Sequence, residues 1–130
     1  MPATQPANPL TTPDSSPDAF WTRLDQLITS SRIVIDRPAG STHPRYPHIR
    51  YPLDYGYLDG TSSGDGNGID LWIGTQPHHR LTAVVCCVDS VKRDTEIKLL
   101  LGCSDAEVTL IRNFHSEGGQ SALAISRKQN

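Results

Sequence analysis

Short apolar segments with strand-forming side chains recur along this 130-residue chain, and they most limit what it can fold into. Residues 69–73, 83–88 and 97–101 are apolar runs bounded by glycine, proline or charge, which is typical of strands. Residues 32–35 alternate polar and apolar side chains before Pro38, and residues 122–125 fit a last strand. Five short strands suggest a small β-barrel, although periodicity by itself indicates only a mainly β, α+β fold.

Two segments have the features of helices. Ser16 fits an N-cap before a helix from residue 17 to about residue 30, with apolar side chains at helical spacing. Ser104 and Glu107 form a capping signature, so we predict a second helix ending near His115. Residues 1–16 hold mainly Pro, Thr, Ser and Asn and predict a disordered tail. The remaining residues, 17–130, are expected to form a single domain.

Composition excludes several classes of protein. The formal charge of −2 does not favour a nucleic-acid binder, which normally has a basic face. No apolar run approaches the ~20 residues that a membrane-spanning helix requires. Because no signal-peptide pattern is visible at the N-terminus, we expect a cytoplasmic protein without a membrane partner.

The three cysteines do not suggest a disulfide framework, a zinc site or a thiol nucleophile. Cys86 and Cys87 are adjacent in a strand-like run, where neighbouring side chains point to opposite faces. Cys103 ends the next apolar run. We therefore expect small buried or half-buried side chains.

The segment 51–70 contains the residues best suited to chemistry. It combines three tyrosines with several glycines and carboxylates, and Asp65 and Asp70 flank a Gly-Asn-Gly-Ile turn. Two carboxylates at this spacing can converge on a divalent cation, while the phenols of Tyr51 and Tyr55 can hold an anion. On local sequence alone, an ordinary turn explains the same residues equally well, because Asp-Gly and Asn-Gly pairs are frequent in hairpins.

Four segments form an ordered set of motifs: Val-Ile-Asp-Arg-Pro-Ala-Gly-Ser at 34–41, Tyr-Pro-Leu-Asp-Tyr-Gly-Tyr at 51–57, Asp-Gly-Asn-Gly-Ile-Asp-Leu at 65–71, and Val-Lys-Arg-Asp-Thr-Glu-Ile-Lys-Leu-Leu at 91–100. In this order they resemble motifs of the soluble (family I) inorganic pyrophosphatases. The chain is thus identified as a short and divergent member of this family. The resemblance implies an OB-like five-stranded β-barrel with an N-terminal helix and a second helix near the C-terminus, and allows a homo-oligomer.

The resemblance also implies a set of site residues. It gives Asp65, Asp70 and Glu96 as ligands of Mg²⁺, with Mn²⁺ as an alternative. Inorganic diphosphate would bind Arg45, Arg50, Tyr51, Tyr55 and Lys98. The catalytic residues would be Asn67, Tyr55 and Lys98, with Asn67 at the position of the family's central aspartate.

This chain departs from the family's pattern, so three functions stay open. An amide at Asn67 cannot accept a proton from water, and the segment between Ser41 and Tyr51 is shorter than the family's. The first function is divalent-metal-dependent hydrolysis of inorganic diphosphate to two phosphates. The second is hydrolysis of a bulkier organic or nucleotide diphosphate, and the third is a non-catalytic phosphate-binding module.

Overall fold

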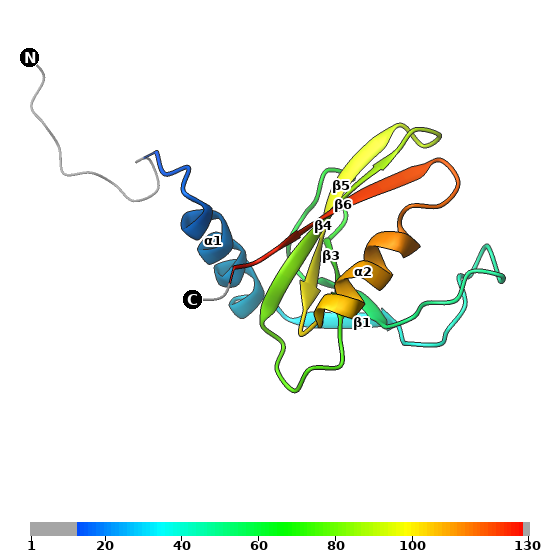
Figure 1. The fold of residues 1–130 in the computed structure, drawn as a ribbon, viewed down its shortest axis with the longest axis horizontal. Coiled ribbons are helices and arrows are strands. Elements are labelled where there is room, and N and C mark those ends of the chain that lie inside the picture. The colour runs from blue at the N-terminus through cyan, green and yellow to red at the C-terminus, as the bar shows by residue number, and fades with distance from the viewer. Residues whose placement is uncertain (1–12, 129–130) are drawn as a thin grey trace, which may run out of the picture.

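A computed structural model of the protein describes residues 13–128, in which a mixed β-sheet lies between two helices (Figure 1). The sheet contains β1 (Ile33–Arg37), β2 (Asp54–Leu58), β3 (Ile69–Ile73), β4 (Leu81–Asp89), β5 (Asp94–Leu101) and β6 (Gln120–Ser126). Its strand order is β1-β2-β3-β5-β4-β6. The β3–β5 pair is parallel and the other pairs are antiparallel.

The predicted fold class is confirmed: the described chain is mainly β with two helices. The sheet has six strands in the described residues rather than five, because β2 forms within the Tyr-Gly-Tyr segment, where no apolar run marks a strand. Strands β1 and β6 stand at opposite ends of the strand order in residues 13–128, so the sheet there is open.

Both helices begin where the sequence predicts. Helix α1 (Pro17–Thr29) is capped by Ser16, whose side chain accepts a hydrogen bond from the amide of Ala19 at 3.1 Å. Helix α2 (Asp105–Phe114) begins with the predicted capping box between Ser104 and Glu107. The predicted tail falls largely outside the described residues, which begin at residue 13. None of the helices within residues 13–128 is long and apolar enough to cross a membrane.

Alternating side chains of the sheet form a separate apolar cluster on each face. On one face Trp21 of α1 packs with Leu71, Val84 and Leu99. On the other face the side chains of α2 pack against β3, β4 and β5; this cluster includes Trp72, Val85, Leu100, Val108 and Ile111. We call the second face the α2 face.

Gly56 allows the backbones of β1 and β2 to approach closely. It is buried at the centre of β2, directly opposite Ile35. A Cβ atom at this position would lie 2.9 Å from the Cα of Ile35 and would overlap the carbonyl group of Val34. Because the obstructing atoms belong to the backbone, no side-chain rotation can make room. The central residue of the Tyr-Gly-Tyr segment therefore has a packing role.

We expect Gly56→Ala to lower the free energy of unfolding by about 3 kcal/mol or more, because β1 must shift away from β2. Urea unfolding would measure this change. Gly64→Ala is the matched control, since its new methyl group would meet only the carbonyl oxygen of Thr95 at 3.8 Å. Equal unfolding midpoints for the two variants would contradict this account of Gly56.

Candidate active site

The parallel pairing of β3 with β5 brings together charged residues that are distant in the sequence. In the β3–β5 register, Trp72 lies opposite Leu100. Two residues earlier on each strand, Asp70 and Lys98 point to the same α2 face. Glu96 stands two residues before Lys98 on β5, so the two side chains point to the same side of the sheet, as the period-two spacing predicts. On its other edge β3 pairs with β2, and there Tyr55 lies opposite Trp72.

Lys98 is the centre of a compact polar cluster. Its Nζ atom lies 2.6 Å from Glu96 Oε1 and 2.9 Å from Asp70 Oδ2. It also donates a hydrogen bond of 2.9 Å to the hydroxyl of Tyr55, which donates in turn to Asp70 Oδ2 at 2.7 Å. All donors of the ammonium group are therefore used, and one cation neutralises part of the charge of two carboxylates.

Burial and charge fix the protonation of this cluster. Burial alone would lower the pKa of Lys98, but its contacts with Tyr55, Asp70 and Glu96 outweigh that effect and raise the pKa. Burial raises the pKa of Tyr55, although Lys98 acts in the opposite direction. At neutral pH the lysine is therefore charged and the phenol is neutral, so Tyr55 acts as a donor and not as a nucleophile.

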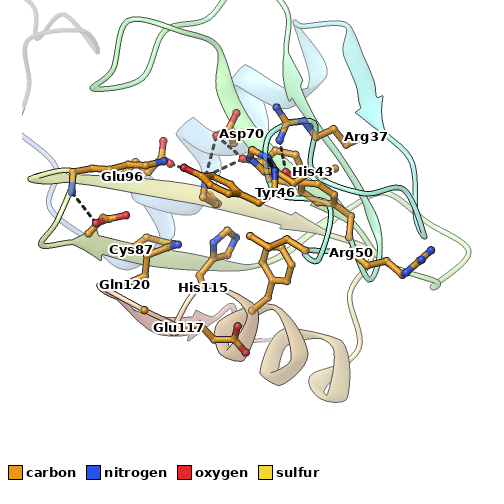
Figure 2. Close-up of a pocket in the computed structure, with 18 of the residues that line it drawn as sticks. Arg37, His43, Tyr46, Arg50, Asp70, Cys87, Glu96, His115, Glu117 and Gln120 are labelled. Carbon is orange, nitrogen blue, oxygen red and sulfur yellow. Dashed lines mark hydrogen bonds and ion pairs between the residues drawn. The ribbon is translucent and has the colours of Figure 1, made fainter.

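The cluster lies in a cavity of about 830 Å³ on the α2 face of the sheet. Strands β2, β3, β4 and β5 supply one part of its lining, and the end of α2 supplies another. Figure 2 shows Arg37, His43 and Tyr46 on one side of the cavity, with His115 and Glu117 on the opposite side. Further lining residues are Arg50, Tyr51, Cys87, Asp89, Lys92, Asp94, Phe114 and Gln120.

Two arginines add positive charge to this cavity. Arg37 donates a hydrogen bond to the hydroxyl of Tyr51, and its guanidinium lies 5.4 Å from the centre of that ring. Arg50 lies at the margin of the cavity (Figure 2), where it donates to the carbonyl oxygen of Gly40 at 2.6 Å. Together with Lys92 and Lys98 they give the cavity four cationic side chains of the kind that bind phosphate groups.

Six of the site residues predicted from the sequence line this one cavity: Arg50, Tyr51, Tyr55, Asp70, Glu96 and Lys98. Three others, Arg45, Asp65 and Asn67, are not among its lining residues. Asp65 and Asn67 lie in the connection between β2 and β3. There the Asp65 carboxylate accepts hydrogen bonds from the Ser63 hydroxyl at 2.6 Å and from the Asn67 amide at 2.9 Å. These bonds hold the pKa of Asp65 below its usual value and close the local turn.

The cavity offers carboxylate oxygens of the type that a hard divalent cation prefers. Asp70 Oδ2 and Glu96 Oε1 are paired with Lys98, whereas Asp70 Oδ1 and Glu96 Oε2 accept no hydrogen bond from residues 13–128. Within that range no three metal-binding side chains converge on one point. The donor chemistry of Asp70 and Glu96 therefore suits a divalent cation.

Sequence reasoning did not assign a role to Arg37 or His115. Arg37 stands inside the first of the four motifs, so its position contained a usable signal. The position of His115 in the sequence contained no such signal, because its contact is with a residue 43 positions away: the indole Nε1 of Trp72 donates to His115 Nε2 at 3.1 Å.

The three cysteines are buried or half-buried, as predicted, and burial raises the pKa of Cys87 to about 11. A protonated thiol fits the prediction that no cysteine is a nucleophile.

His115 should make stability depend on pH. Burial, with a smaller effect from Lys98, lowers its pKa to about 3, so the folded protein holds the neutral ring while the unfolded chain protonates near pH 6.5. Stability contributed by the neutral ring is therefore lost as the pH falls from about 6.5 toward 3. At pH 5 the expected loss is about 2 kcal/mol relative to pH 7.

Urea unfolding at pH 7 and pH 5 would measure this loss in the wild type and in His115→Leu. The variant lacks the titrating ring and should lose about 2 kcal/mol less between the two pH values, whatever its absolute stability. Equal losses in both proteins would show that His115 is already protonated in the fold at pH 5.

Solved structures with a similar fold are bacterial inorganic pyrophosphatases. One from Neisseria gonorrhoeae has a TM-score of 0.55 and 17% sequence identity, and the match covers 68% of this chain and 77% of that chain. One from Helicobacter pylori has a TM-score of 0.51 and 15% identity, with 72% and 81% covered. No protein-family model and no curated protein matches the sequence. The resemblance predicted from four motifs is thus confirmed in the fold: this chain folds as the soluble inorganic pyrophosphatases do.

Proposed function

We propose that the protein hydrolyses inorganic diphosphate to two phosphates in the cavity on the α2 face. The observation that supports this proposal is the Lys98 cluster, in which a buried cation and two carboxylates lie in the same cavity as Arg37 and Arg50. A diphosphate needs cations for its oxygens, and its hydrolysis needs a means to position and activate water. This cavity combines cationic side chains, which can bind the diphosphate oxygens, with carboxylates, which can help to position water.

Binding and orientation of the diphosphate fall to the cationic side chains in this proposal. Lys98 provides a fixed positive charge, since three neighbouring oxygens hold its Nζ atom in place. Arg37 has a planar guanidinium that can bind two phosphate oxygens at once. Hydrolysis then forms one new P–O bond to the oxygen of water and breaks the bridging P–O bond, and one proton of the water passes to the departing phosphate.

Asp70 and Glu96 are the residues that would hold a divalent cation, Mg²⁺ or Mn²⁺. Such a cation, when bound, neutralises phosphate charge and lowers the pKa of a coordinated water. Phosphate oxygens would compete for Lys98, which would free both carboxylates from their ion pairs. Tyr55 keeps its proton and continues to donate to Asp70 Oδ2, which fixes the orientation of that carboxylate.

A second function is favoured by the ion pairs themselves. Because Lys98 pairs with both Asp70 and Glu96 and neutralises part of their charge, the cavity can receive a phosphate group without a metal ion. The protein would then bind diphosphate and leave it intact, as a non-catalytic module.

The proposal also includes a cytoplasmic location. The cysteines at positions 86, 87 and 103 are all free thiols, which suits a reducing compartment.

We expect the purified protein to release phosphate from inorganic diphosphate in the presence of Mg²⁺ or Mn²⁺. Addition of a chelator should stop this release. A colorimetric phosphate assay would measure this release. Arg37→Met should lower the rate at least about tenfold, because a charge-assisted phosphate contact is worth roughly 1.5 kcal/mol or more. Diphosphate binding without release would identify the non-catalytic module, and absence of both would reject the phosphate site.

Asp70 and Asp65 should differ in their importance. Since Asp70 lies in the cavity and Asp65 lies in the β2–β3 connection, Asp70→Asn should reduce phosphate release far more than Asp65→Asn. The same assay with matched amounts of folded protein would compare them. Equal losses would indicate that both carboxylates act in one site, as the family resemblance implies.

A further inference from the structure

One wall of the cavity is formed by aromatic rings from the connection between β1 and β2. This connection folds back on itself through a bridge between Thr42 and Arg50. Within it, the amide of His43 donates to Ile49 O and the amide of Ile49 donates to Tyr46 O, both at 2.9 Å. The segment is therefore a closed turn that holds His43 and Tyr46 against the cavity (Figure 2).

The imidazole of His43 helps to fix this wall. Its Nδ1 atom accepts hydrogen bonds from the amides of Arg45 at 3.0 Å and Tyr46 at 3.2 Å, which requires that nitrogen to be unprotonated. The ring centres of His43 and Tyr46 are 5.0 Å apart, and Tyr46 also contacts His48. His43 is thus an uncharged planar ring in a fixed position.

The rings continue from this wall to the Lys98 cluster. His43 stacks on Tyr51 with centres 6.4 Å apart, and Tyr51 lies 5.4 Å from Tyr55. The Nζ atom of Lys98 lies 5.3 Å from the Tyr55 ring. A ligand that lies along this series can place its phosphates at the cations and an aromatic group near the opening.

Exposure and size also point to a larger ligand. Tyr46 is 44% exposed although it lines the cavity, so this aromatic residue is accessible to a ligand. The volume of about 830 Å³ lies within the range of sites for drug-sized ligands, roughly 300–1,000 Å³. Inorganic diphosphate fills only a small part of such a cavity.

We propose that His43 and Tyr46 form a subsite for the planar ring of an organic diphosphate, of which a nucleoside diphosphate is the fitting class. The proposal rests on the proposed function, since it places the phosphates of this ligand at Arg37 and Lys98. If the ligand is hydrolysed, water adds to the terminal phosphorus and the bridging P–O bond breaks, which yields a monophosphate ester and phosphate.

The test is calorimetric titration of the purified protein with ADP and, separately, with inorganic diphosphate. Tyr46→Ala should raise the Kd for ADP about tenfold, because the base loses its stacking partner. The same variant should change the Kd for inorganic diphosphate by no more than about twofold. Tyr46→Phe keeps the ring and should retain the affinity for ADP. Leu110→Ala is a matched control, since Leu110 is 43% exposed on α2 and does not line the cavity.

The outcomes separate this inference from the proposed function. Binding of inorganic diphosphate without binding of ADP would overturn the aromatic subsite and leave the phosphate site intact. An equal loss of both ligands in Tyr46→Ala would also overturn it, because Tyr46 would then act on the fold or the phosphates. Tyr46-dependent binding of ADP without phosphate release from either ligand would support the subsite and reject hydrolysis.

Discussion

The buried ammonium group of Lys98 is the interaction on which the site depends. Moving such a charge out of water is costly unless oxygen atoms replace its hydration shell. Here Asp70, Glu96 and Tyr55 supply those oxygens from three different strands. The alignment of β2, β3 and β5 is therefore coupled to the contacts of Lys98 Nζ with these three oxygen atoms. A ligand that binds here has to exchange some of these contacts for its own.

The aromatic residues of the core are in direct contact with the residues that line the cavity. Trp72 is fully buried beneath the cavity and contacts the rings of Tyr51, Tyr55 and Phe114. Its indole N–H donates to His115, which lines the cavity on the α2 side. The apolar packing that stabilises the sheet thereby sets the positions of phenol and imidazole groups that line the cavity. Rigid support of this kind reduces the ordering that binding would otherwise require.

The sequence allowed much of this to be predicted, within physical limits. Period-two spacing correctly put Glu96 and Lys98 on one face, and capping residues predicted where both helices begin. Strand β2 was not predicted, because close packing at Gly56 replaces the usual apolar pattern. The contact of His115 with Trp72 depends on long-range packing, and no local rule expresses it. The placement of Asp65 was equally open, since the same residues suit a turn or a metal site.

The parallel pairing of β3 with β5 has a consequence for how the protein folds. Residues of the Lys98 cluster are separated by up to 43 positions in the sequence, and β4 lies between β3 and β5 along the chain. Such non-local pairings form only after the entropy of closing a long loop has been overcome. A chain in which β3 and β5 have not yet paired therefore lacks the site. The Lys98 cluster therefore exists only when the central strands of the native sheet are paired.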